Sequence, residues 1–225
     1  MLNTLPAYIT AVFIATVLLT LGLFVKAIKN KAIVAIISIL WLALTGALAY
    51  NGFFKDDSGL PPHFIFAVLP PLITIILLLT IKTCRRFIDN IDLRTITLLH
   101  IVRIPVEMVL YWLYLNKAVP GLMTFSGRNF DILAGITAPV IYFICFKDHI
   151  AVNKRLLLIW NFISLLLLLN IVVNAILSLP FPFQQFAFDQ PNIAILYFPF
   201  VWLPSFIVMT VLLSHLVAIR RLVKK

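Results

Sequence analysis

Two charged side chains, Arg103 and Glu107, lie inside an apolar segment that is long enough to cross a membrane. They are four residues apart, which places them within ion-pair reach on an α-helix. At about 100° per residue, several polar side chains of this segment share one face about 80° wide. That stripe consists of His100, Arg103, Glu107, Tyr111 and Tyr114. An unpaired charge within a bilayer costs several kcal/mol, so the stripe must face protein or water.

Two interpretations of Arg103 and Glu107 remain open at this point. In the first, the two side chains neutralise each other and fix their helix in a bundle. In the second, they form a site in which Arg103 holds an anionic group and Glu107 binds a proton or cation, as intramembrane ionisable residues often do. Direct pairing with Arg103 would keep Glu107 charged, which argues against simple proton transfer.

A second polar group, Arg128, Asn129 and Asp131, directly precedes another apolar segment. Asn129 or Asp131 could cap the N-terminus of the following helix. Alternatively, Arg128 and that helix N-terminus could receive an anion from the external side. The predicted ligand-binding residues are therefore His100, Arg103, Glu107, Tyr111, Arg128, Asn129 and Asp131.

Other polar residues suggest further chemistry without a spaced motif. His100 and His215 fall at similar predicted depths, where two histidines could ligate a b-type haem. Asn161 and Ser164 share an apolar segment with Asn170 and Asn174, and such residues usually form hydrogen bonds between helices. The sequence contains no HExxH motif, no clustered Cys and His set and no nucleophile motif. We therefore predict no catalytic residues and no metal site, and the cofactor is unknown.

Seven apolar segments account for most of the 225 residues, of which 63% are hydrophobic and 12% charged. A soluble domain is about half apolar and about a quarter charged, whereas a membrane-spanning helix needs about 20 mostly apolar residues. We predict an all-α integral membrane protein, a seven-transmembrane-helix bundle with one domain over residues 1–225. The predicted spans are residues 7–25, 32–53, 63–81, 96–116, 132–146, 156–178 and 193–219.

The lysines and arginines between these spans are unevenly divided. Fourteen lie on one side and three on the other, and Arg103 is the remaining one of the 18. Because cytoplasmic loops carry the excess of basic residues, we expect the N-terminus outside and the C-terminus inside a bacterial cytoplasmic (inner) membrane. The net charge of +10 follows from these loops. Nucleic-acid binding is excluded, since it requires a basic face on a folded soluble module.

The leading hypothesis for function is a membrane protein that binds or transports a small polar or anionic molecule at the buried stripe. Prolines inside four of the predicted spans, residues 63–81, 96–116, 132–146 and 193–219, fit either packing kinks or helices that surround a cavity. A second hypothesis is a non-catalytic subunit or scaffold of a membrane complex, whose stripe faces a partner protein. A third is a membrane enzyme or a b-haem protein.

Overall fold

The computed structural model describes residues 5–55, 61–147 and 150–224. Most of the described chain is helical, in agreement with the predicted all-α class. The longer elements are α1 (Ala7–Lys26), α2 (Lys31–Tyr50), α3 (Ile65–Thr80), α4 (Lys82–Asp89), α5 (Leu93–Leu99), α6 (Arg103–Leu115), α7 (Ile132–Cys145), α8 (Lys154–Leu177) and α9 (Val208–Val223). Short turns are η2 (Phe53–Lys55), η3 (His100–Val102), η4 (Gly121–Met123) and η5 (Ala194–Leu196), and η6 (Leu203–Ile207) is a π-helix. Strands β1 (Phe146–Lys147) and β2 (Ile150–Ala151) form an antiparallel pair between α7 and α8.

Five helical segments of the described chain are long and apolar enough to cross a membrane. They are Ala7–Lys26, Lys31–Tyr50, Leu93–Leu115, Lys154–Leu177 and Leu203–Val223. A sixth segment joins them if α3 and α4, which meet at an angle of 95°, count as one. The remaining apolar helix, α7, has 14 residues. The chain therefore has the helices of an integral membrane protein. By length and apolar composition, the described residues give five or six membrane-spanning helices, fewer than the seven predicted.

Two predicted spans differ from the helices at positions where proline interrupts the backbone ladder. The predicted span 193–219 is continuously helical only from Leu203, first as the π-helix η6 and then as α9. Pro199 lacks the N–H group that a helix interior requires, and Pro204 lies in the first turn of η6. The predicted span 96–116 is longer and consists of α5, η3 and α6. Pro105 has no N–H group to donate to the carbonyl of Ile101. The chain around Ile101 forms the tighter 3-10 turn η3 instead of a continuous α-helix.

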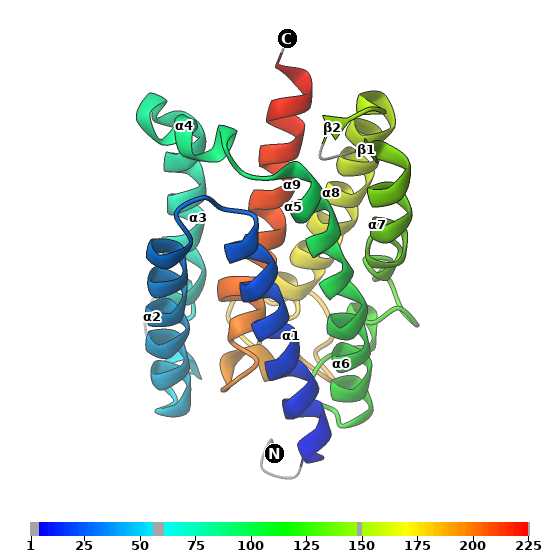
Figure 1. The fold of residues 1–225 in the computed structure, drawn as a ribbon. Helices are drawn as coiled ribbons and strands as arrows, with labels where there is room; N and C mark the ends of the chain where they lie inside the picture. Colours follow the sequence, from blue (N-terminus) through cyan, green and yellow to red (C-terminus); the bar gives the residue numbers. More distant parts are fainter. Residues whose placement is uncertain (1–4, 56–60, 148–149, 225) are drawn as a thin grey trace.

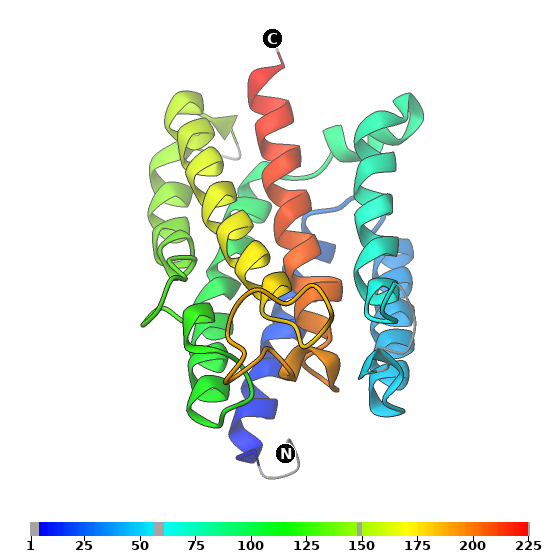
Figure 2. The same cartoon turned by 180° about the vertical axis from the view of Figure 1, so that it is seen from behind.

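The helices run up and down between two ends of a bundle, with the termini at opposite ends (Figure 1). Segments Leu93–Leu115 and Leu203–Val223 lie deepest. In their 18-residue apolar stretches, 61% and 50% of the residues are buried inside the molecule, against 28% in α1, α2 and α8. The connection between α8 and α9, residues 178–202, lies over the lower part of the bundle (Figure 2). The two deepest segments therefore form the centre around which the others pack.

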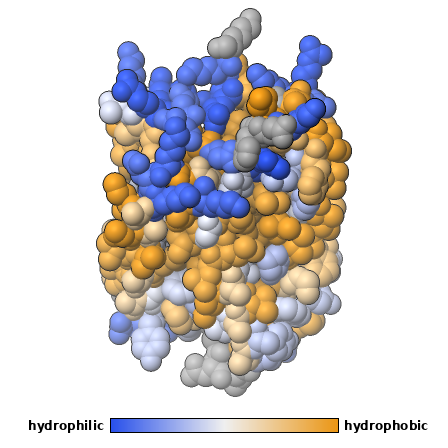
Figure 3. All heavy atoms as spheres, in the orientation of Figure 1, coloured by the Kyte–Doolittle hydropathy of each residue, from blue (hydrophilic) through white to orange (hydrophobic). Residues whose placement is uncertain are grey.

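Many large apolar side chains remain exposed on the outer helices, among them Leu40, Phe143 and Leu166, which are 64%, 76% and 65% exposed. They belong to an apolar band around the middle of the molecule, and hydrophilic residues gather at the C-terminal end (Figure 3). We call this the basic end, because the lysines and arginines after α1, in α4 and in the last turn of α9 lie there. An exposed apolar band of this kind is compatible with contact to lipid.

The α8–α9 connection is fastened to the rest of the chain by backbone and side-chain hydrogen bonds. The backbone N–H of Asn192 donates to Ser178 O over 2.8 Å, and that of Ala194 donates to Ala118 O over 3.0 Å. The Gln190 side-chain amide donates to Val119 O and to Tyr114 O. Among the aromatic residues of this connection, Phe181 is buried.

Candidate functional site

Eight buried polar residues from separate parts of the chain meet in the centre of the bundle, Ser164 through its backbone carbonyl, and we call this group the core polar cluster. Its members are His100 of η3, Arg103 and Glu107 of α6, Asn129 and Asp131 before α7, Asn161 and Ser164 of α8, and His215 of α9. Each of them is at most 5% exposed. Five of the seven predicted ligand-binding residues are among them. The sequence therefore located the polar centre of the protein.

Arg103 pairs with Asp131, and this corrects the expectation that it pairs with Glu107. Nη1 of Arg103 lies 3.3 Å from Asp131 Oδ1 and donates to Ser164 O over 3.3 Å. Of the two possible helix caps, Asp131 occupies the N-cap position of α7 but its side chain makes no cap hydrogen bond, whereas Asn129 Oδ1 accepts from the backbone N–H of Asp131. The carboxylate instead faces the guanidinium, because a buried cation needs a counter-charge more than a helix end needs a cap.

His215 is neutral, and its hydrogen bonds define its tautomer. Nη2 of Arg103 donates to His215 Nε2 over 2.9 Å, and an arginine can only donate. Nε2 therefore carries no proton, and the ring proton is on Nδ1. This Nδ1–H donates to Asn161 Oδ1 over 2.9 Å, while the Asn161 amide donates to Leu157 O over 2.8 Å. Asn161 thus orients His215, which accepts the hydrogen bond from Nη2 of Arg103.

His100 stacks on His215, and this arrangement does not fit the haem hypothesis. The two ring centroids are 4.0 Å apart and the planes differ by 22°. Axial ligation requires both nitrogens to point at an iron between the rings, whereas these rings lie face to face and both nitrogens of His215 are engaged. The edge of Trp160 packs on His100, and its indole N–H donates to Thr137 Oγ1 over 2.9 Å.

Glu107 is held by Asn129 from the loop before α7. The Asn129 side-chain amide donates to Glu107 Oε1 and, over 3.0 Å, to Met123 O. Its side-chain oxygen accepts from the backbone N–H of Asp131 over 3.0 Å. Asn129 therefore connects both carboxyl-bearing residues. The second carboxyl oxygen of Glu107, Oε2, is buried and has no hydrogen-bond partner in the described part of the chain.

The charges of the core polar cluster do not cancel when both carboxyl groups are ionised. Arg103 contributes one positive charge, Glu107 and Asp131 contribute one negative charge each, and His215 is neutral in its hydrogen-bonded tautomer. Arg103 is engaged by Asp131, His215 and Ser164, which leaves the Glu107 carboxylate as the excess charge. An unpaired charge within a bilayer costs several kcal/mol, and binding of a proton or small cation would remove that cost.

Helices α6 and α7 approach each other closely at Gly135, and this contact brings Asp131 to Arg103. A methyl group at Gly135 would lie 2.9 Å from Ile104 Cγ1, 3.1 Å from Ile104 N and 3.2 Å from Arg103 Cβ. A side chain at this position would therefore push α7 away from α6 and lengthen the ion pair. The small residue is part of the site although it carries no functional group.

Two predicted site residues lie apart from the core polar cluster. Tyr111 is half-buried and packs against Phe125 and Tyr114, at centroid distances of 4.9 and 6.4 Å. The Arg128 side chain is exposed, and its backbone carbonyl accepts a hydrogen bond from Asn170 over 2.8 Å.

Sequence reasoning left His215, Asn161 and Ser164 out of the predicted ligand-binding set. The available signal was spacing: Asn161 and Ser164 are three residues apart and share one face of α8. His215 was assigned to the same depth as His100, which agrees with their stacking. Among the described residues, no three His, Cys, Asp or Glu side chains are grouped as metal ligands.

Comparison of the chain with family models, with curated proteins and with solved structures gives no match.

Proposed function

We propose that this protein transports a small polar or charged solute across the membrane and that the core polar cluster is its binding and coupling site. The observation that carries the proposal is a second buried carboxyl group, Glu107, in addition to Asp131, which pairs with Arg103. Glu107 is 1% exposed, and its Oε2 has no hydrogen-bond partner among the described residues. A purely structural polar core gains nothing from an unsatisfied charge, which is costly within a bilayer.

The coupling species that fits this core is a proton or a small monovalent cation at Glu107. Arg103 would otherwise hold Glu107 as a permanent carboxylate, but it is engaged by Asp131 and His215. Asn129 leaves one Glu107 oxygen free to take a proton. Solute binding near Arg103 could then be linked to proton uptake through the shared contacts of Asn129 with both carboxyl-bearing residues.

The orientation of the polar stripe favours a site within the chain over the alternative of a subunit whose stripe faces a partner. His100, Arg103 and Glu107 are 1%, 2% and 1% exposed. No partner protein is needed to cover these groups, because the chain's own helices do so. For this reason we retain transport as the proposed function.

For the membrane arrangement, we propose seven crossings with the N-terminus outside and the C-terminus inside, in a bacterial inner membrane. Support comes from the basic end, where the lysines and arginines lie as the positive-inside rule expects. Helix α3 would cross with α4 lying along the interface, in keeping with the angle of 95° between them. Helix α7, with 14 residues or about 21 Å, would cross with the help of the chain before it.

A pH jump on protein reconstituted in a solid-supported membrane tests this proposal with the proton as the probe. Proton entry into a buried site moves charge within the membrane and produces a transient current. We expect such a current for the native chain and its loss in Glu107→Gln, which keeps the shape of the side chain and its bond to Asn129. The matched control is Asp189→Asn, because Asp189 is an exposed carboxylate of the α8–α9 connection.

Equal transient currents from the native chain and Glu107→Gln, at equal protein density in the membrane, would contradict the proposal. Loss of the current in Asp189→Asn as well would assign it to surface titration instead of the core. In either case the core polar cluster would be a scaffold.

A further inference from the structure

A pocket of about 290 Å³ opens at the basic end between the turn after α1 and helix α4. Its polar lining consists of Lys29, Asn30, Arg86 and Asn90, and its apolar lining includes Ile28 and Ile91. The last two are 3% and 2% exposed and belong to the packed interior. The pocket therefore joins two cations and two amides to an apolar wall.

The walls of this pocket are tied together by the protein itself. The backbone N–H of Asp92 donates to Ala27 O over 2.9 Å, which joins the chain after α4 to the end of α1. The Asn90 side-chain amide donates to Arg86 O over 2.7 Å at the end of α4. The pocket is thus formed before any ligand enters, and its ligand would bear little ordering cost.

The two cations of the pocket have no carboxylate partner in the described part of the chain. Neither Lys29 nor Arg86 forms an ion pair with a carboxylate in the described residues, and both are exposed. Other basic residues nearby are already engaged: Arg85 Nε donates to Leu79 O over 2.9 Å at the end of α3, and Arg220 pairs with Asp89. Lys29 and Arg86 remain available to an anion.

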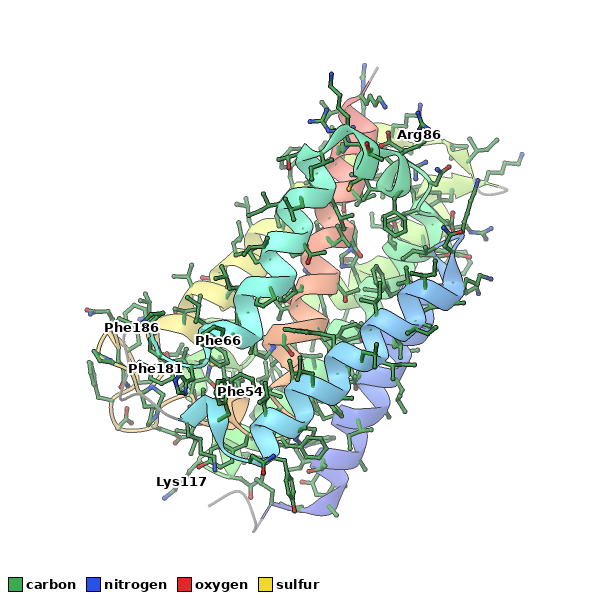
Figure 4. All side chains as sticks on the ribbon, turned by 90° about the vertical axis from the view of Figure 1, so that its left-hand side faces the viewer. Phe54, Phe66, Arg86, Lys117, Phe181 and Phe186 are labelled. Carbon is green, nitrogen blue, oxygen red and sulfur yellow. The ribbon has the colours of Figure 1, made fainter. Side chains whose placement is uncertain are left out.

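Helix α4 has the orientation and composition of a helix that lies in a membrane interface. It meets α3 at 95°, and it crosses the end of the bundle (Figure 1). Ile88 is fully buried and Phe87 packs against the same apolar group, whereas Lys82 and Arg86 are exposed. Figure 4 shows Arg86 at the end opposite Lys117 and Phe181. A basic amphipathic helix at this level meets lipid head groups.

We infer that this pocket binds the phosphate of an anionic phospholipid of the inner leaflet. Lys29 and Arg86 would hold the phosphate, Asn30 and Asn90 would donate to the polar head group, and Ile28 with Ile91 would contact the first carbons of the acyl chains. The chemistry is that of basic pockets which bind lipid head groups on the cytoplasmic side. This inference concerns a different end of the molecule from the core polar cluster and does not depend on transport.

Native mass spectrometry of the full chain in a neutral detergent tests the inference, with phosphatidylglycerol, phosphatidylcholine and inorganic phosphate as probes. We expect one tightly held phosphatidylglycerol per chain and much weaker binding of phosphatidylcholine. Each basic residue near a membrane surface contributes about 1 kcal/mol, or about fivefold in affinity. The double substitution Lys29→Gln with Arg86→Gln should therefore weaken phosphatidylglycerol binding about 25-fold, and Arg86→Lys should retain most of it.

The matched control is Lys147→Gln with Arg155→Gln, which removes the same charge from two exposed residues that do not line the pocket. Its affinity should stay within about twofold of the native value, since the removed charges lie away from the pocket. An equal loss in the control would mean attraction to general surface charge and would overturn the inference. Equal binding of phosphatidylcholine would also overturn it, and inorganic phosphate that displaces the lipid would reassign the pocket to a free anion.

Discussion

Replacing each core carboxyl group by its amide reveals which of the two neutralises Arg103. In Asp131→Asn the guanidinium loses its partner at 3.3 Å. Removal of one partner of a buried ion pair costs about 3–5 kcal/mol, because the other charge remains buried without compensation. Arg103 keeps its bonds to Ser164 O and His215, so we expect a loss of about 3 kcal/mol in the free energy of unfolding.

Glu107→Gln should have a much smaller effect. The side-chain oxygen of glutamine can still accept the hydrogen bond from Asn129, and the substitution removes a charge that Arg103 does not pair with directly. Replacing a buried charge that has no close partner by a neutral group of the same shape is nearly neutral or stabilising. We expect a change of about 1 kcal/mol or less.

The assay is reversible unfolding in mixed micelles with a denaturing detergent, followed by the fluorescence of the four tryptophans, among which Trp160 contacts His100. A double-mutant cycle adds Arg103→Gln to each substitution, and the coupling energy should reach about 1–3 kcal/mol with Asp131 and stay below about 0.5 kcal/mol with Glu107. A larger loss in Glu107→Gln than in Asp131→Asn would refute this assignment and restore the pair expected from the sequence.

Two further predictions concern helix packing and a surface ion-pair group. Gly135→Ala places a methyl 2.9 Å from a side-chain atom of α6 and should lower the free energy of unfolding by about 1–3 kcal/mol. The control Gly22→Ala, with nothing within 4 Å of the added methyl, should raise it by up to about 1 kcal/mol. Equal effects of the two substitutions in the same unfolding assay would contradict the close contact at Gly135. Burial acts to raise the pKa of Asp89, but Lys224 and Arg220 outweigh it and lower the pKa. The attachment of α4 to α9 should therefore persist above the ordinary pKa of an aspartate and weaken as the pH falls below about 4. The weaker attachment should appear as faster amide hydrogen exchange in α4 below about pH 4. In Asp89→Asn, the exchange rate in α4 should no longer depend on the titration of this group.

The inward orientation of the polar stripe could be predicted from the sequence because the bilayer restricts where charge can lie. Arg103 and Glu107 had to share a protected face, and both are buried as expected. The counter-ion of Arg103 could not be predicted in the same way. Asp131 is distant in sequence and reaches Arg103 through the close approach of α6 and α7 at Gly135, a contact that local periodicity does not contain.

The extent of the helices was predictable where the helix coincides with the apolar stretch and less so where the apolar stretch continues beyond the helix. Helix α7 begins at Ile132, as predicted, and ends one residue early. The final span begins about ten residues later than predicted, because apolar composition continues through Pro199 while the backbone there has no regular ladder. Its π-helix leaves backbone carbonyls without helical partners, and Trp41 donates to that of Ser205 over 3.0 Å. This hydrogen bond from α2 is a tertiary contact and cannot be predicted from local sequence.

The hydrogen bonds of the α8–α9 connection close the end of the molecule opposite the basic end. Uncovering the core from the end opposite the basic end breaks the hydrogen bonds of Asn192 to Ser178 and of Ala194 to Ala118, together with those of the Gln190 side chain. At the basic end, two pockets lie beside α4, and the ion pairs of Asp89 with Arg220 and Lys224 attach α4 to α9. In the proposed transport cycle, opening at the end opposite the basic end would have to break these hydrogen bonds.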